Sequence, residues 1–455
     1  MLAVDLEQIK KYNVPGPRYT SYPPAVHFKP ELDVNFVTGK IRENNTTTRD
    51  ISLYFHLPFC RSLCWYCGCN MVITRKQSQS QTYLDYLAKE MDLIAGMTNR
   101  ARRVVQIHLG GGTPTFLLPE EIRQLGEMTR SRFNVASDVE SGVEVDPRRL
   151  TREHIEAMRA AGHNRISIGV QDTNPQVQVA INRIQPFEQS AQSVEWARAH
   201  GFQSISIDLI YGLPHQTVES FSRTLDQILT LQPDRLALFS YAHVPWIKPA
   251  QKLLPPEAMP TPETKFGIFK LAVERLTSEG FSYIGMDHFA RKGDELEVAQ
   301  REGKLQRNFQ GYSTRAGADI YAFGMTSISQ TPDIYWQNEK DLKRFYARLD
   351  QGELPVANGY ALTQEDRLRR ETIMRLMCDM KLDYDAMSKQ LAIDFQSYFS
   401  RELANLTSLE EDGLVGLSPN GMSVTESGRL LIRNIAMCFD PNVSAPREGV
   451  YSRTI

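Results

Sequence analysis

Apolar and polar residues alternate along residues 50–245 in a pattern that predicts strands and helices in turn. Short apolar runs rich in β-branched and aromatic side chains predict six strands. These runs lie at residues 51–57, 104–110, 141–146, 165–172, 204–212 and 235–242. Segments with helical spacing separate them, near residues 81–97, 118–132, 151–161, 187–200 and 217–230. Such alternation is typical of a parallel sheet with right-handed crossovers that is covered by helices.

The pattern loosens after residue 245. A proline-rich stretch is followed by a predicted helix at 262–279 and then by irregular, charged sequence. A closed (β/α)8 barrel needs two more regular units, so we predict an α/β fold with a partial (β/α)6 TIM-like barrel. Ligands of such sheets bind at the carboxyl ends of the strands.

The C-terminal part of the chain has a different character. Helical segments at 363–379, 384–391 and 395–407 precede a short hairpin and a last helix, which predicts a mostly helical, winged-helix-like domain. Its charge is mixed, without the basic stripe that binds DNA. The segment at 14–24 is too rich in proline for a helix, and it either closes a cleft as a lid or wraps the surface.

We therefore predict three parts. They are an N-terminal lid or extension at 1–35, a catalytic domain at 36–355 and a helical C-terminal domain at 356–455.

Composition narrows the class of protein. The chain is 41% hydrophobic and 23% charged, as globular proteins are. Lys plus Arg (52) nearly balance Asp plus Glu (54), so no overall field selects nucleic acid or an anionic membrane. The first 22 residues lack the apolar core of a secretory signal, and no apolar run approaches the roughly 18–20 residues of a membrane helix. We expect a cytoplasmic protein.

Four of the six cysteines lie within ten residues, at Cys60, Cys64, Cys67 and Cys69. The C-x3-C-x2-C spacing of the first three places three thiolates around one loop, where they are able to hold three irons of a [4Fe–4S] cube. The open fourth iron then chelates the amino and carboxylate groups of S-adenosylmethionine. An electron passed to that molecule breaks a carbon–sulfur bond and gives a 5′-deoxyadenosyl radical.

Other readings of the cysteines are weaker. A structural zinc site usually has two separated C-x2-C pairs, and a two-cluster ferredoxin needs a second set of cysteines. A fourth ligand would close the position that S-adenosylmethionine needs, so we expect Cys69 to lie beside the cluster without binding it. The isolated Cys378 and Cys438 read as core thiols.

Polar and glycine residues recur where the predicted strands end. The triple glycine at 110–112 allows close approach of backbone to a ligand. Glu144, Gln171 and Asp208 end the next strands, and Arg183 follows. Each alone is a plausible structural residue, and their meeting at one barrel rim is what favours a site. Aromatic residues near the cysteines either pack or shield a cluster; they are Tyr54, Trp65 and Tyr66.

These motifs together resemble those of the oxygen-independent coproporphyrinogen III oxidases (coproporphyrinogen dehydrogenases) of the radical S-adenosylmethionine superfamily. The likeness rests first on PGPRYTSYP at 15–23, FCRSLCWYCGCN at 59–70 and GGGTPT at 110–115. It extends to GVQD at 169–172, IDLIYGLP at 207–214, GMDHFAR at 285–291, RNFQGY at 307–312 and LLIRNIAMCFD at 430–440. It therefore covers nearly the whole chain.

The resemblance implies roles for particular residues. Cys60, Cys64 and Cys67 would bind the cluster. Contacts to a first S-adenosylmethionine would come from Tyr54, Gly111, Glu144, Ala242 and Ile328. Contacts to a second molecule would come from Tyr66, Gly112, Thr113, Gln171, Arg183 and Asp208. At the position of Tyr66 the family commonly has phenylalanine.

The implied reaction is oxidative decarboxylation of two propionates of coproporphyrinogen III to vinyls, giving protoporphyrinogen IX in haem biosynthesis. The cofactor supplies the difficult step, so no catalytic acid or base is expected. Arg18 and Tyr19 are candidates to bind substrate carboxylates. The implied partner is a reduced electron donor such as flavodoxin or ferredoxin, and the implied state is a monomer.

Two alternatives remain from the same superfamily. One is a haem-binding chaperone without this activity, which the presence of Cys69 and of the segment 15–23 disfavours. The other is a radical enzyme that acts on tetrapyrroles by methyl transfer with ring opening.

Overall fold

Residues 6–30, 32–443 and 451–454 are described by the computed structural model. The predicted lid also includes residues 1–5 and 31, and the predicted C-terminal domain includes 444–450 and 455; these lie outside the described residues. No helix in the described part is long and apolar enough to cross a membrane.

The six predicted strands are confirmed, and they lie side by side in sequence order. They are β2 (Ile51–Leu57), β5 (Arg103–Gly111), β6 (Asn134–Val145), β7 (Arg165–Gln171), β8 (Ser204–Tyr211) and β9 (Arg235–Ser240). Each neighbouring pair is parallel, as an α/β partial barrel requires. Their inward and outward side chains are mostly buried, in agreement with the apolar character of the strands on both faces.

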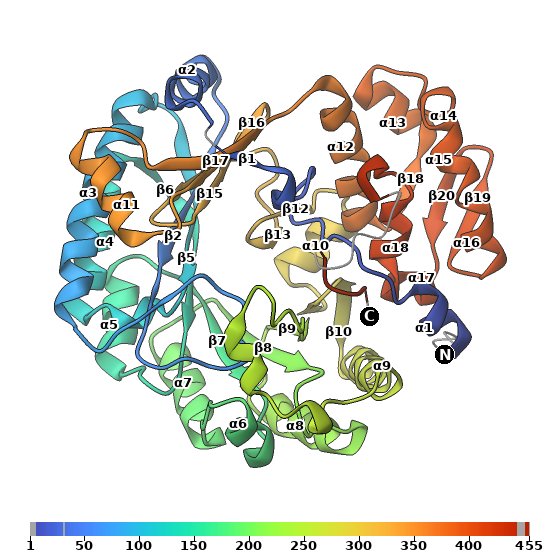
Figure 1. Ribbon diagram of the computed structural model, residues 1–455, viewed down its shortest axis with the longest axis horizontal. Helices are drawn as coiled ribbons and strands as arrows, with labels where there is room; N and C mark the ends of the chain where they lie inside the picture. Colours follow the sequence, from blue (N-terminus) through green and yellow to red (C-terminus); the bar gives the residue numbers. More distant parts are fainter. Residues whose placement is uncertain (1–5, 31, 444–450, 455) are drawn as a thin grey trace.

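Helices cover the outer face of this curved sheet (Figure 1). The predicted ones are α3 (Ser78–Met97), α4 (Pro119–Arg132), α5 (Arg152–Ala160), α7 (Phe187–Ala199) and α8 (Val218–Thr230), followed by α9 (Pro262–Ser278). A short helix that the sequence pattern missed, α6 (Pro175–Ala180), lies in the crossover that follows β7.

The expectation of irregular sequence after residue 280 is wrong, because the sheet continues at both edges. On one side β9 pairs with β11 (His288–Arg291), which pairs with β10 (Phe281–Gly285). On the other side β2 pairs in parallel with β14 (Asp319–Phe323). Four strands continue from that edge, β15 (Ile328–Gln330), β16 (Ile334–Asn338), β17 (Val356–Ala361) and β1 (Lys29–Pro30). All of these strands except β17 have two to five residues, which is too short to produce a readable alternation.

A buried ion pair holds the added strand β14 against the barrel. The side chains of Arg102, just before β5, and Asp319, at the start of β14, are 1% and 2% exposed and form a salt bridge. Arg102 Nη1 also donates to the hydroxyl of Tyr321 at 3.3 Å, and its Nε to the carbonyl of Arg49 at 2.8 Å. The charges of the pair are therefore compensated inside the protein.

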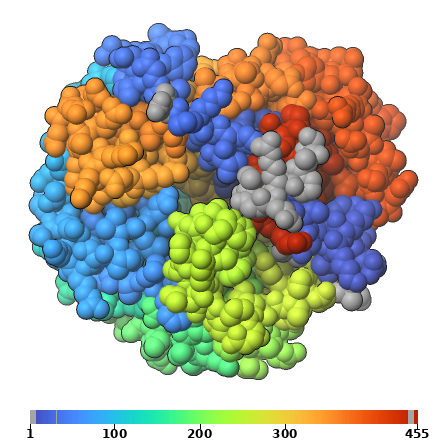
Figure 2. All heavy atoms as spheres, viewed as in Figure 1, coloured from blue at the N-terminus to red at the C-terminus, as the bar shows by residue number. Residues whose placement is uncertain are grey.

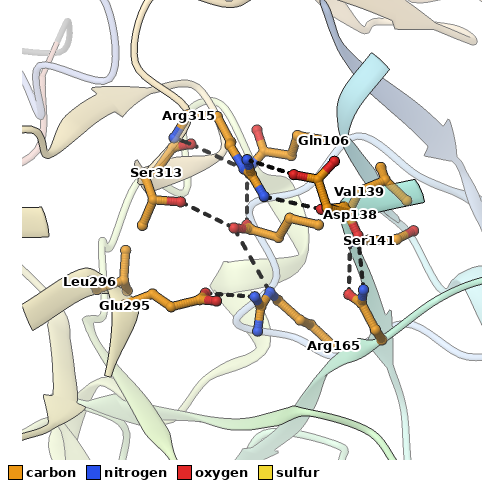
Figure 3. Close-up of polar contacts among 12 residues, drawn as sticks. Gln106, Asp138, Val139, Ser141, Arg165, Glu295, Leu296, Ser313 and Arg315 are labelled. Atoms are coloured by element: carbon orange, nitrogen blue, oxygen red, sulfur yellow. Dashed lines mark hydrogen bonds and ion pairs between the residues drawn. The ribbon is translucent and has the colours of Figure 1, made fainter. Parts of the chain in front are cut away.

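A polar network closes the barrel at the end opposite the carboxyl ends of its strands (Figure 3). Glu140 on β6 accepts from Gln106 at 2.9 Å and lies 3.8 Å from Arg165, the first residue of β7. Gln106 also donates to the Ser313 hydroxyl at 3.2 Å, and Arg315 donates to the Asp138 carbonyl at 3.1 Å. These bonds fasten the hairpin of β12 (Gln306–Asn308) and β13 (Gly311–Ser313) into the open side of the barrel.

The C-terminal region contains the predicted helices and hairpin. Its helices are α12 (Gln364–Asp379), α13 (Tyr384–Leu391), α14 (Phe395–Tyr398), α15 (Ser400–Ala404), α16 (Thr407–Glu411), α17 (Glu426–Leu430) and α18 (Ile432–Met437). The helix predicted at 395–407 is interrupted at Phe399, which is fully buried and packs on Phe439. A third strand, β18 (Lys381–Asp383), joins the hairpin of β19 (Val415–Ser418) and β20 (Gly421–Val424).

The N-terminal segment lies between the barrel and the C-terminal region (Figure 1). After α1 (Leu6–Tyr12) it runs in an irregular path, and Tyr19 and Tyr22 are buried in the same hydrophobic core as the C-terminal helices. The backbone N–H of Gly16 donates to the carbonyl of Ser452 at 3.1 Å. Figure 2 shows this blue segment against the red C-terminal residues, on the same face as the yellow-green chain near residue 250.

Candidate active site

Strand ends from three neighbouring barrel strands form one side of the site. The ring of Tyr54 on β2 stacks on His108 of β5, with centroids 6.0 Å apart. His108 Nε2 lies 3.0 Å from Oε1 of Glu144 on β6, and the Gly111 N–H donates to Oε2 at 3.3 Å. A Cβ on Gly110 would lie 2.8 Å from Glu144, so this close approach requires glycine.

Glu144 is held in its ionised form. Burial alone would raise the pKa of this carboxyl, but the hydrogen bond and charge of His108 and the N–H of Gly111 outweigh burial, and the pKa is lowered. A carboxylate at a strand end can accept from the hydroxyls or ammonium of a ligand.

The cysteine loop lies directly beside the glycine loop. Cys60 ends the short strand β3 (Phe59–Cys60), and its Sγ is 3.3 Å from the hydroxyl of Thr113. The N–H of Gly112 donates to the Leu57 carbonyl at 2.9 Å. A Cβ on Gly112 would lie only 2.5 Å from the Pro58 carbonyl oxygen. The cysteine loop and the glycine loop therefore contact each other through backbone atoms.

The thiols suit a cluster better than a single zinc ion. All six cysteines, each within the described residues, are free. Arg148 and Arg183 lie 3.5 and 3.7 Å from the sulfur of Cys64, and a hydrogen bond from Cys69 lowers the pKa of Cys67 to about 7. The hydrogen bond favours the thiolate of Cys67, whereas burial raises the pKa of Cys60 to about 11. In the described residues no three ligating side chains surround one ion position, whereas the ligands of a cube bind different irons.

The predicted residues from β7 and β8 lie together on the next part of the rim. Arg183 is buried and donates to the Gly169 carbonyl at 2.6 Å, and it pairs with Asp146 at 3.1 Å. Gly169 is opposite Asp208 in the strand register. Gln171 has a φ of 72°, a left-handed conformation that is uncommon for residues other than glycine.

Ala242 and Ile328 enter from elements outside the six-strand barrel. Gln251 Nε2 donates both to the Tyr66 carbonyl at 3.1 Å and to the Ala242 carbonyl at 3.2 Å, which ties these two residues together. Ile328 on β15 lines a cavity of about 430 Å³ with Tyr54 and Glu144. Every predicted cofactor residue is therefore at this end of the barrel.

One of the two residues predicted to bind substrate has its side chain in another part of the protein. Tyr19 is 1% exposed and donates its hydroxyl to Asp440 at 3.0 Å, so its side chain belongs to the C-terminal core. Arg18, its neighbour, lines both the 430 Å³ cavity and a second one of about 500 Å³. The sequence could not show which of Arg18 and Tyr19 faces the cavity, because apolar and polar residues do not alternate regularly in a proline-rich segment.

Several residues that line the candidate site were not identified from the sequence. His56, His108, His288, Arg307 and Gln310 all line the 430 Å³ cavity. His56 lies two residues after Tyr54, and His108 lies two residues before the triple glycine, both within predicted strands. These positions could have identified the two histidines as candidate site residues. The other three lie in segments whose strands were missed.

Asp208→Asn is expected to flatten the pH dependence of stability of the cofactor-free protein. Burial raises the pKa of Asp208 to about 7 in the fold, against about 4 in an unfolded chain. The folded state therefore binds more protons between these values, and the free energy of unfolding of the wild type falls as pH rises from about 4 to 7. The variant should be the more stable by about 1–2 kcal/mol above pH 7, a difference reduced by the partial exposure of the residue. Unfolding midpoints at pH 5 to 8 measure this, and parallel curves would contradict it.

Comparison with known proteins agrees with this arrangement. A family model described as the radical SAM superfamily matches residues 54–228, and one described as the HemN C-terminal domain matches 362–431. The chain is 45% identical over 457 residues to the oxygen-independent coproporphyrinogen III oxidase of Escherichia coli, covering 99% of this chain and 98% of that one. The Synechocystis sp. protein of the same name is 43% identical over 454 residues, with 99% and 97% covered.

A solved structure is similar over the same length. It is described as coproporphyrinogen III oxidase (HemN) from Escherichia coli, a radical SAM enzyme, and aligns with a TM-score of 0.92 at 43% identity. The alignment covers 97% of this chain and all of that one.

Proposed function

The chain belongs to the oxygen-independent coproporphyrinogen III oxidases of the radical S-adenosylmethionine superfamily, and on this premise we propose which of its residues hold the cofactors. Its activity is the oxygen-independent oxidation of coproporphyrinogen III in haem biosynthesis. The full-length likeness to oxidases of that name carries this assignment.

Cys60, Cys64 and Cys67 are the proposed ligands of the [4Fe–4S] cluster. Bound there, the cluster and S-adenosylmethionine would supply the radical chemistry that oxidises the propionate side chains. Arg148 and Arg183 place positive charge beside Cys64, which would stabilise a negatively charged cluster.

The first S-adenosylmethionine is proposed to lie against Tyr54, Gly111, Glu144, Ala242 and Ile328. The glycines have no side chain that would stand between the backbone and the methionyl part, and the ionised Glu144 accepts from an ammonium or hydroxyl group. A second molecule is proposed beside Tyr66, Gly112, Thr113, Gln171, Arg183 and Asp208. The proximity of Arg183 to both Gly169 and Cys64 supports a second site adjoining the cluster loop.

An anaerobic assay tests the function directly. The reconstituted protein is incubated with coproporphyrinogen III, S-adenosylmethionine and a reductant, and the products are oxidised and separated. Protoporphyrin IX is the expected product. Tight haem binding without turnover would instead indicate a chaperone, and a methylated linear product would indicate ring opening.

The proposed electron donor is a reduced flavodoxin or ferredoxin. Residues 51–84, which include the cysteine loop, contain no Asp or Glu but carry Arg61, Arg75 and Lys76, and the last two are exposed. A basic surface beside the cysteine loop suits a small acidic carrier. We also propose that the protein is monomeric, which sedimentation would test, and cytoplasmic, where reducing conditions keep its six thiols free.

Cys69→Ser is expected to leave the cluster in place. Cys69 is exposed and hydrogen-bonded to Cys67, so its loss should raise the pKa of the Cys67 thiol without removing an iron ligand. We expect unchanged iron content and an unchanged [4Fe–4S] absorption spectrum, with slower turnover. Loss of about a quarter of the iron, or a spectrum typical of a three-iron cluster, would show that Cys69 is a ligand.

A further inference from the structure

The cavity beside Tyr54 has a wall that belongs to the β12–β13 hairpin, and Arg307 stands in that wall. Arg307 is 5% exposed, yet its Nε and Nη1 have no hydrogen-bond partner among the described residues. The guanidinium lies over the Tyr312 ring at 4.8 Å, and Nη2 donates to the Arg18 carbonyl at 3.5 Å. A buried cation with unused N–H groups is costly unless a ligand completes it.

Two neighbours of Arg307 also have buried nitrogen atoms without hydrogen-bond partners among the residues that the structure describes. Gln310 Nε2 and His288 Nδ1 are buried without a partner in the described part of the chain, and both line the same cavity. Burial lowers the pKa of His288 to about 4, so the ring is neutral and one of its nitrogens is a donor.

The two acidic side chains on this cavity bond to groups other than Arg307. Glu144 accepts from His108 and Gly111. Asp287 lies 3.5 Å from Arg18, which also donates to the Ser240 carbonyl at 2.9 Å. Neither carboxylate therefore satisfies Arg307, and the unused donors call for an anion from outside the chain.

We propose that Arg307, assisted by Gln310 and His288, binds one propionate carboxylate of coproporphyrinogen III. The proposal rests on the function given above and names a specificity residue for it. A guanidinium presents two parallel donors to a carboxylate, which fixes orientation as well as position. The polar network at the base of the barrel holds the hairpin, so the anchor is rigid before substrate enters.

The anchored propionate should be one that survives the reaction. A cation paired with the carboxylate that leaves would stabilise the charged reactant more than the neutral carbon dioxide, and the barrier would rise. Arg307 therefore serves best on a propionate that both substrate and product retain, so that it turns a different propionate toward Tyr54 and Glu144.

The test compares Arg307→Met and Arg307→Lys with Arg301→Met, an exposed charge control 65% open to solvent. In the reconstituted enzyme, Arg307→Met should raise KM for coproporphyrinogen III by about 10- to 100-fold, with a smaller change in kcat. Lysine should rescue part of the loss, because it keeps the charge but not the paired donors. Arg301→Met should match the wild type.

Equilibrium binding separates anchoring from structural damage. Fluorescence titration of the same holoproteins with coproporphyrin III should show a weakened Kd in Arg307→Met. Titration with its tetra-amide, which has no carboxylates, should give equal Kd values in wild type and variant. Equal weakening of both probes, or no change for coproporphyrin III, would overturn the proposal. Failure of the function itself would appear separately, as absence of protoporphyrin from the wild type.

Discussion

Cys64→Ser is expected to abolish both cluster assembly and cleavage of S-adenosylmethionine. Cys64 is the most buried of the three proposed ligands, and its sulfur lies close to both Arg148 and Arg183. Serine has an alcohol that stays protonated at neutral pH and is a poor ligand for iron. Iron and sulfide content, the visible absorption spectrum, and formation of methionine and 5′-deoxyadenosine under reducing conditions measure the result.

Cys438→Ser is the matched control. Cys438 lies in the C-terminal region, with its sulfur 3.8 Å from the Asn434 carbonyl, and a serine hydroxyl can make the same bond. This variant should assemble a full cluster and cleave S-adenosylmethionine at the wild-type rate. An intact [4Fe–4S] spectrum in Cys64→Ser would contradict the assignment of Cys64 as a cluster ligand.

Arg102→Met is expected to destabilise the fold by about 3–5 kcal/mol. The substitution removes one member of a buried pair and leaves the Asp319 carboxylate inside the protein without its main cation. Asn44 and Arg49 still contact Asp319, but Arg49 is 37% exposed and its Nε lies 3.6 Å away. Chemical unfolding followed by circular dichroism gives the shift in midpoint.

The neighbouring residue supplies the comparison. Arg103 pairs with Asp138 at 2.9 Å, but the two side chains are 52% and 62% exposed. Exposed pairs contribute about 1 kcal/mol or less, so Arg103→Met should unfold close to the wild type. Similar losses in the two variants would contradict the argument, because they would mean that burial of the pair does not decide its contribution.

The barrel could be predicted because its strands are long and regular. Ile51–Leu57 and Ser204–Tyr211 each combine β-branched residues with clear boundaries, and the structure has strands there within a residue of the prediction. The edge strands could not be predicted for the opposite reason. Ile328–Gln330 has three residues and pairs with β14 on one side and β16 on the other, contacts that depend on the folded sheet.

Some residues of the site could likewise be predicted from the sequence, and others could not. Cys60, Glu144 and Asp208 could be found because each follows a recognisable strand or belongs to a spaced motif. Arg307 and His288 lie in the motifs at 307–312 and 285–291, but their role could not be predicted, because what distinguishes them is the absence of partners for specific nitrogen atoms in the described residues. Such a shortage exists only in three dimensions, and no spacing of residue types encodes it.

The contact between the two ends of the chain determines when the substrate cavity is completed during synthesis. Val14 bonds to Thr454 across 440 positions, and Arg433 holds the Pro17 carbonyl next to Arg18. At about 5–20 residues per second, a ribosome needs roughly 20–90 s to cover that interval. The cysteine loop and the barrel strands emerge within this time, before Val14 and Pro17 can make their contacts with the C-terminal residues. The N-terminal segment therefore cannot complete its contacts until residues 433 and 454 have been synthesised.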